Sequence, residues 1–174
     1  AASAQVVDYV KGLRVKFVDI DPHTLCLDVE DLKKKINKNT RAIIAVHMGG
    51  HYCDMESILS IPRVKNSDIK IIEDCAHCLG GEYAGKKLGT LGHIGCFSFE
   101  AKKNMTTGDG GMLVTNDRSL EPLLRRLRWV GMDKDTWKRT TSNESYSWYY
   151  EINELGSFFV IISLSIQTLP CLKI

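Results

Sequence analysis

The sequence lacks a strong excess of either charge, and it has no internal repeat and no low-complexity linker. Its 174 residues carry 23 lysines and arginines against 21 aspartates and glutamates, a formal net charge of +2. That balance gives no reason to expect nucleic acid or an anionic membrane surface as a partner. A chain of this length and composition can form one soluble globular domain with its own core.

The sequence also lacks a signal peptide, a clear membrane span and a disulfide framework. The apolar stretch at residues 157–174 is too short, and too often broken by serine, to indicate a span. The cysteines are scattered along the chain, which favours free thiols in a reducing compartment such as the cytoplasm. They are Cys26, Cys53, Cys75, Cys78, Cys96 and Cys171.

Both ends of the chain are unusual. Residues 1–12 are typical of a helix already under way, without a start methionine or a capping residue. Residues 157–174 form a bare apolar tail, which a soluble domain seldom exposes. We therefore expect a fragment of a longer protein.

The hydrophobic pattern predicts an α/β fold. Uninterrupted apolar strands that alternate with amphipathic helices are typical of a parallel or mostly parallel sheet with helices on both faces. Asp28 and Asp54 are candidate N-caps of two of these helices. We expect strands at 15–21, 41–48, 69–75, 95–99 and 111–117, and helices at 28–39, 54–61 and 118–132.

Ligands of such sheets bind beyond the carboxyl ends of the strands. His47, Asp74, His77 and Ser98 all follow predicted strands. A carboxylate at the position of Asp74 must be paired or hydrogen-bonded; it either caps the next turn or faces a cationic ligand atom such as a protonated pyridine nitrogen. His77 could then contact the ring of the same ligand. A structural role is the commoner one for any single histidine, and it stays open for His77, His47 and His51.

Two adjacent lysines, Lys102 and Lys103, precede the loop sequence MTTGDGG. Most surface lysines are only solvated. A lysine that is desolvated beside a tight glycine loop with several hydroxyl donors could instead act as an amine nucleophile.

A competing pattern predicts a metal site. Cys75 and Cys78 are separated by fourteen residues from His93 and Cys96, which approximates the spacing of a four-ligand zinc site. Cys75 and Cys96 adjoin apolar runs, however, and free cysteine is a common buried apolar residue. The alternative to an enzyme is thus a non-catalytic, zinc-stapled or interaction domain.

Three segments together resemble one enzyme family. They are FVDIDP, AIIAVHMGGHYCDMESI and IIEDCAHCLGGEYAGKKLGTLGHIGCFSFEAKKNMTTGDGGMLVTND. They resemble the DegT/DnrJ/EryC1/StrS sugar aminotransferases, which are pyridoxal-phosphate (PLP) enzymes of the aspartate aminotransferase fold, fold type I. The match runs from about residue 2 to 156, so the resemblance implies that 1–156 is part of a PLP-binding large domain and 157–174 an atypical tail.

The resemblance implies roles for particular residues. In the family pattern F-S-F-x-x-x-K-x-x-T-T-G-E-G-G, Lys103 takes the place of the Schiff-base lysine and Lys102 that of a variable residue. Ser98 takes the place of the hydroxyl that helps to hold the cofactor phosphate. Asp74 matches the carboxylate at the pyridine nitrogen, and His77 matches a Gln or His against the ring.

The resemblance also implies a reaction. Lysine rather than histidine at position 103 favours transamination over dehydration, with an amino group passing from an amino acid such as glutamate to a nucleotide-linked keto sugar. Family members are homodimers whose sites are completed by the second subunit. Residues 146–156 are most similar to enzymes that make 4-amino-4,6-dideoxy sugars.

The sequence departs from the family pattern in several places. Asp109 replaces the usual Glu, and residues 50–53 lack the expected proline. The family's phosphate-gripping loop would precede Ala1, and the tail 157–174 is unlike the polar, arginine-bearing helix of the family. We therefore expect the 174-residue chain alone to bind PLP weakly or not at all, and not to turn over.

Overall fold

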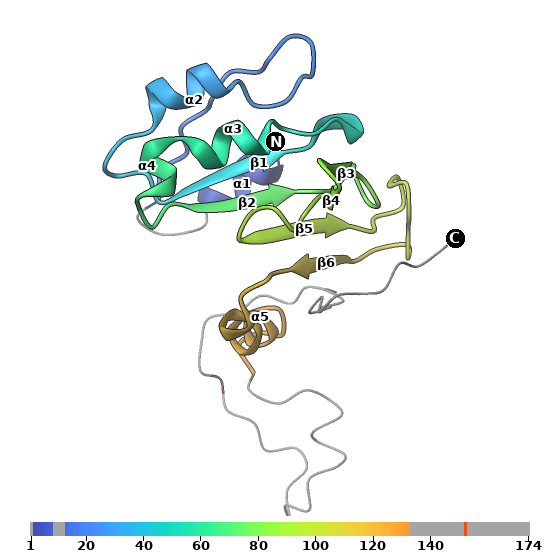
Figure 1. Ribbon diagram of the computed structural model, residues 1–174. Coiled ribbons are helices and arrows are strands. Elements are labelled where there is room, and N and C mark those ends of the chain that lie inside the picture. Colours follow the sequence, from blue (N-terminus) through green and yellow to red (C-terminus); the bar gives the residue numbers. More distant parts are fainter. Residues whose placement is uncertain (1, 9–12, 133–151, 153–174) are drawn as a thin grey trace, which may run out of the picture.

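The computed structural model describes residues 2–8, 13–132 and 152 (Figure 1). Its centre is a mostly parallel four-stranded sheet of order β1-β2-β5-β6, in which β6 alone runs antiparallel to its neighbour. This architecture confirms the predicted fold class. The strands are β1 (Ala42–Val46), β2 (Lys70–Asp74), β5 (Ile94–Ser98) and β6 (Gly111–Val114).

Short helices and one hairpin surround the sheet. The hairpin strands β3 (Glu82–Tyr83) and β4 (Lys86–Lys87) are joined through Ala84 and Gly85, both with positive φ, as tight hairpin turns require. The helices are α1 (Ala2–Asp8), α2 (Val29–Lys35), α3 (Met55–Ser60), α4 (Pro62–Lys65) and α5 (Glu121–Leu127), with 3₁₀ turns η1 (Met48–Gly50) and η2 (Arg118–Leu120).

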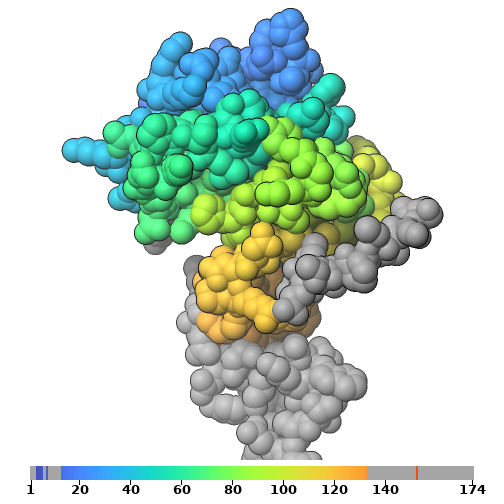
Figure 2. Space-filling view, viewed as in Figure 1, coloured from blue at the N-terminus to red at the C-terminus, as the bar shows by residue number. Residues whose placement is uncertain are grey.

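The two faces of the sheet are covered differently. Ile43, Ala45 and Ile71 are buried in the main core together with residues of α3 and α4. Figure 2 shows the blue, teal and green segments packed against one another in one body, with the orange segment around α5 below it. Alternate residues of the same strands, such as Ile72 and Asp74, point to the opposite face, on which α1 lies, and are only half-buried. Polar groups on that second face are therefore partly accessible.

Local capping explains where two helices begin. The Asp28 carboxylate accepts a hydrogen bond from the Asp31 amide at 2.8 Å, and the Asp54 carboxylate accepts one from the Ser57 amide at 3.0 Å. These bonds satisfy amides that have no partner within the helix. Both predicted N-caps are confirmed.

The strand predicted at 15–21 is wrong. Within the described residues this segment has only one bridge, between Ile20 and Leu27, and Phe17 is 73% exposed. The Asp19 amide donates to the Asp31 carboxylate at 2.7 Å instead of to a strand. The β-branched residues here fit a strand, but a strand also needs a neighbouring strand with which to pair.

The helix predicted at 118–132 is shorter than expected: residues 118–120 form the 3₁₀ turn η2, and the α-helix α5 begins at Glu121 and ends at Leu127. The pattern also missed the short α4. Within the part of the chain that the structure describes, no helix is long and apolar enough to cross a membrane. The predictions for the tail 157–174 and, apart from residue 152, for the segment 146–156 lie outside the described residues.

Candidate active site

The register of the sheet places Asp74 and Ser98 on one face at one edge. Asp74 pairs with Cys96 across the parallel β2–β5 ladder, and Ser98 lies two residues further along β5. Residues two apart in a strand share a face. Burial, together with the nearby Asp74 carboxylate, raises the pKa of the Cys96 thiol to about 11. The arrowheads of β1, β2 and β5 meet at this edge (Figure 1).

Within the described part of the chain, the Asp74 carboxylate has one hydrogen-bond donor on each oxygen. Its Oδ1 accepts from the Ala76 amide at 3.1 Å, and its Oδ2 accepts from the Ser3 hydroxyl of α1 at 2.6 Å. The first bond is the expected cap of the following turn. Sequence reasoning missed Ser3, because no local pattern tells which strand end a distant helix will cover.

The backbone around Asp74 is fixed from both neighbouring strands. The His47 amide donates to the Asp74 carbonyl at 3.1 Å, and the Cys75 amide donates to the Cys96 carbonyl at 2.8 Å. These bonds continue the β1–β2 and β2–β5 ladders past the strand ends. The position of the Asp74 side chain is therefore set by the sheet rather than by a loose loop.

His77 lies on the same loop, three residues after Asp74, and is exposed. Its Nδ1 accepts a long hydrogen bond of 3.4 Å from the Gly49 amide in η1. The loop itself is tightened by a bond from the Cys78 amide to the Cys75 carbonyl at 3.2 Å. His77 is thus available at the sheet edge, whereas His51 is exposed and His47 is fully buried.

Lys103 lies in the loop that leaves β5 and returns as β6. Phe99 is buried, and it anchors the base of this loop: its amide donates to the Gly110 carbonyl at 2.9 Å and its carbonyl accepts from the Thr107 amide at 3.0 Å. Lys103 is half-buried whereas Lys102 is exposed. Among the described residues, the Lys103 amino group has no acid or acceptor as a partner.

The threonine hydroxyls of this loop hold the loop together. Thr106 Oγ1 donates to the Phe99 carbonyl at 3.0 Å and accepts from the Gly108 amide at 2.9 Å. The Thr107 hydroxyl donates to the Asp109 carbonyl. These two hydroxyls therefore donate within the loop and not to a ligand. Ser98 differs: its Oγ accepts from the Glu100 amide at 3.4 Å, and its hydrogen has no described acceptor.

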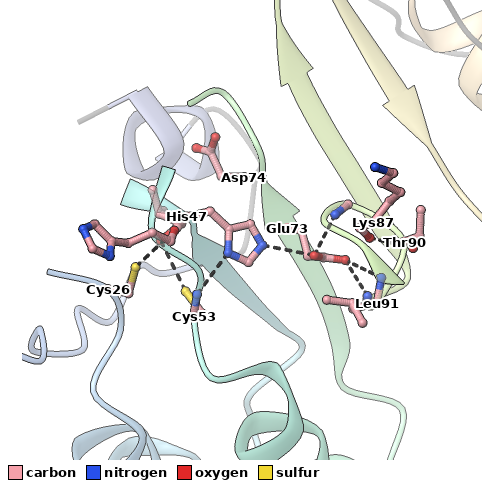
Figure 3. Close-up of polar contacts among 12 residues, drawn as sticks. Cys26, His47, Cys53, Glu73, Asp74, Lys87, Thr90 and Leu91 are labelled. Carbon is pink, nitrogen blue, oxygen red and sulfur yellow. Dashed lines mark hydrogen bonds and ion pairs between the residues drawn. The ribbon is translucent and has the colours of Figure 1, made fainter. Parts of the chain in front are cut away.

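A buried, hydrogen-bonded pair of side chains, His47 and Glu73, lies next to the site on the other face of the sheet (Figure 3). Both side chains are completely buried, and His47 Nε2 lies 3.0 Å from Glu73 Oε2. His47 Nδ1 accepts from the Cys53 amide at 3.1 Å, so Nε2 carries the hydrogen that is donated to Glu73. His47 is therefore a structural histidine, one of the two roles that the sequence left open.

Glu73 receives three further donors from the loop before β5. The amides of Gly89, Leu91 and Gly92 donate to its carboxylate at 2.8, 2.8 and 2.6 Å. Burial alone raises the pKa of Glu73, but the hydrogen bonds from His47, Gly92 and Gly89 outweigh it, so the pKa falls below its ordinary value. Sequence reasoning missed this role; the signal was an acid inside an apolar strand.

The structure does not support the zinc alternative. The His93 amide donates to the carbonyl of Ile71 near the start of β2, whereas Cys75 follows its end, about 13 Å further along an extended strand. Within the described ranges, the group of potential ligands close enough for one ion is a different one: His47, Glu73 and Cys75. Its carboxylate is already occupied by four donors.

The residues at the sheet edge suit a phosphorylated pyridine cofactor. Asp74 offers an oriented carboxylate, Ser98 an O–H without a described acceptor, and Lys103 an amine without a described partner. An acid for a ring nitrogen, a hydroxyl for a phosphate and an amine for a carbonyl are the groups that PLP requires. This donor set fits the cofactor.

Comparisons with known proteins agree with this chemistry. Residues 1–165 match the DegT/DnrJ/EryC1/StrS aminotransferase family. The chain is 46% identical over 156 residues to the uncharacterized protein MJ1066 of Methanocaldococcus jannaschii, covering 90% of this chain and 39% of that protein. It is 45% identical over 119 residues to GDP-perosamine synthase of Escherichia coli O157:H7, covering 68% of this chain and 32% of the enzyme.

A solved structure shares the fold. The putative sugar aminotransferase Spr1654 of Streptococcus pneumoniae, solved in its PMP form, superposes with a TM-score of 0.76 at 28% identity, covering 90% of this chain and 43% of that one. The chain therefore spans about two fifths of this neighbour's length. Since the match covers nearly all of its residues, the chain belongs to the DegT/DnrJ/EryC1/StrS aminotransferase family and has part of the fold type I architecture.

Proposed function

We propose that the protein transfers an amino group from an amino acid to a nucleotide-linked keto sugar, with PLP as cofactor. The observation that carries this proposal is Lys103, a half-buried residue whose amine has no described partner, in a loop anchored just past the edge where Asp74 and Ser98 share a face. This chain spans only part of its relatives, so the activity is proposed for the complete protein, to which these residues contribute.

Each of these side chains has a proposed task. Asp74 holds the protonated ring nitrogen, and Ser98 donates its free hydrogen to the phosphate. His77 lies against the ring. The amine of Lys103 would hold the cofactor at its carbonyl and would serve as the base that takes up the proton released at the substrate carbon. That Lys103 and Asp74 face one another across the ring stays a prediction.

The cofactor supplies, when bound, an electron-poor ring that accepts the electron pair released at the substrate carbon. The chain must keep that ring nitrogen protonated and keep water from the amine. A carboxylate that is fixed by two donors meets the first requirement, because its charge favours the protonated nitrogen. The half-buried position of Lys103 favours the second.

The substrate class is proposed from relatives. Among those similar to this chain are GDP-perosamine synthases and a UDP-N-acetyl-3-dehydro-alpha-D-glucosamine 3-aminotransferase of Acidithiobacillus ferrooxidans. Their names share a nucleotide-linked sugar. Glutamate as amino donor, a homodimer as the working form and a cytoplasmic location complete the proposal. The free thiols of five described cysteines are compatible with a reducing compartment.

The adjacent lysines provide a matched test. The complete protein is incubated with PLP, reduced with borohydride and digested, and the modified peptide is identified by mass spectrometry. We expect one cofactor adduct at Lys103. Lys103→Ala should abolish both the adduct and turnover with glutamate and a nucleotide keto sugar, whereas Lys102→Ala should leave both nearly unchanged because Lys102 is exposed.

Several results would contradict the proposal. Adduct formation at Lys102, or equal labelling of many surface lysines, would show that the loop does not single out Lys103. A protein that keeps full turnover as Lys103→Ala would require a different amine. Stoichiometric zinc in the purified protein would instead revive a metal-stapled domain.

A further inference from the structure

The hydroxyl of Ser3 makes the shortest contact of the proposed cofactor acid. Ser3 Oγ lies 2.6 Å from Asp74 Oδ2, and the two residues are 71 positions apart in the chain. An O–H···O distance of about 2.6 Å is typical of a hydrogen bond to an ionised carboxylate. The contact is partly buried, on the less covered face of the sheet.

We propose that Ser3 is a positioning residue, which holds the Asp74 carboxylate in the orientation that the ring nitrogen of the cofactor requires. This proposal rests on the proposed function. The torsion that turns a carboxylate about its last bond is soft and broad. The Ala76 amide restrains Oδ1 from the loop, and Ser3 restrains Oδ2 from α1. Two donors from separate elements therefore fix one plane for the carboxylate.

The bond leaves room for a ligand. Each carboxylate oxygen has two lone pairs, and among the residues that the structure describes each oxygen of Asp74 has one donor. One acceptor position per oxygen remains for a protonated ring nitrogen. Figure 3 shows the carboxylate turned away from the neighbouring His47–Glu73 pair, which belongs to the opposite face.

A purely structural role for Ser3 makes a different prediction. If the bond serves only to dock α1 on the sheet, removing it loosens the helix whether or not Asp74 carries a carboxylate toward the cofactor. If it positions the carboxylate, its loss matters for cofactor binding only while that carboxylate is present. A double-mutant cycle separates these cases.

The test measures the dissociation constant of PLP for the complete protein by fluorescence titration. The variants are Ser3→Ala, Ser3→Thr, Asp74→Ala and the double variant, with Gln5→Ala as a matched control on the exposed side of α1. We expect Ser3→Ala to weaken binding about three- to tenfold, because the carboxylate is then no longer held in one plane and must be ordered when the cofactor binds. Ser3→Thr should restore binding, and Gln5→Ala should not change it.

The cycle decides the outcome. In the Asp74→Ala background we expect Ser3→Ala to cause no further loss of PLP affinity. Without cofactor, the single variants Ser3→Ala and Gln5→Ala should have similar melting temperatures. Two results would overturn the role of Ser3 but leave the proposed function standing. One is an equal loss of PLP affinity from Ser3→Ala in both backgrounds. The other is unchanged affinity in Ser3→Ala while Asp74→Ala weakens binding. If the wild type takes up no PLP, or if Asp74→Ala binds as well as wild type, the proposed function of the site fails first.

Discussion

Glu73→Gln is the substitution that most directly tests how the sheet edge is held in place. The carboxylate accepts two donors on each oxygen: Leu91 and Gly92 on Oε1, and Gly89 and His47 on Oε2. A glutamine of the same shape can accept on one side only. Its amide hydrogens would then face two N–H donors in a completely buried site.

The expected cost follows from this geometry. Each buried donor left without an acceptor costs about 1–3 kcal/mol, so two of them predict a loss of about 3 kcal/mol in the free energy of unfolding. With an m-value of about 2 kcal/mol/M in urea, the midpoint should fall by about 1.5 M. The control is Glu30→Gln: this acid is 72% exposed in its ion pair with Lys33, so its loss should cost under about 0.5 kcal/mol.

The same carboxylate should also shape the acid limb of the stability curve. The pKa of Glu73 is lower in the folded protein than its ordinary value, so the unfolded chain binds more protons. Its stabilising contribution is therefore present above about pH 4.5 and is lost as the pH falls below that value. Glu73→Gln should flatten this part of the curve. A loss no larger than that of Glu30→Gln, or an unchanged acid limb, would refute the network as drawn.

Two further outcomes check the packing around this edge. Gly95→Ala should lower the free energy of unfolding by about 3 kcal/mol, because its new methyl group would clash with the Gly89 carbonyl oxygen. The control Gly49→Ala meets no atom within 4 Å and should cost only about 1 kcal/mol, for its left-handed backbone. Equal urea midpoints of the two variants would contradict the close approach at Gly95. Burial raises the pKa of Cys53 to about 12, so iodoacetamide at pH 8 should label this thiol in urea but not in the native protein, as peptide mass spectrometry would show.

Much of the fold could be predicted because local signals and burial agree there. The apolar strands 42–46 and 70–74, and the Asp28 and Asp54 caps, needed no knowledge of distant residues. The segment 15–21 has equally strong β propensity, yet it is not a strand, because pairing depends on a partner and not on composition. Propensity alone cannot distinguish these cases.

The site could be predicted in outline but not in its supporting contacts. Asp74 and Ser98 follow from the rule that ligands bind past the carboxyl ends of strands, and the resemblance singled out Lys103 from Lys102. The partners Glu73 and Ser3 could not be found in this way. The role of Glu73 depends on hydrogen bonds from the loop at Gly89–Gly92, and that of Ser3 on the position of α1 over the end of β2. Both contacts join residues that are far apart in the sequence.

The adjacent acids Glu73 and Asp74 have different surroundings although they are neighbours in one strand. Successive side chains of a strand point to opposite faces, so neighbouring carboxylates enter different surroundings. Glu73 is sealed in the core by four donors, whereas Asp74 keeps acceptor positions on the half-open face. A slip of one residue in the β2 register would exchange them. The four hydrogen bonds to the buried Glu73 carboxylate oppose such a slip. The orientation of Asp74, the proposed cofactor acid, therefore depends on Glu73, which lies on the opposite face of the sheet.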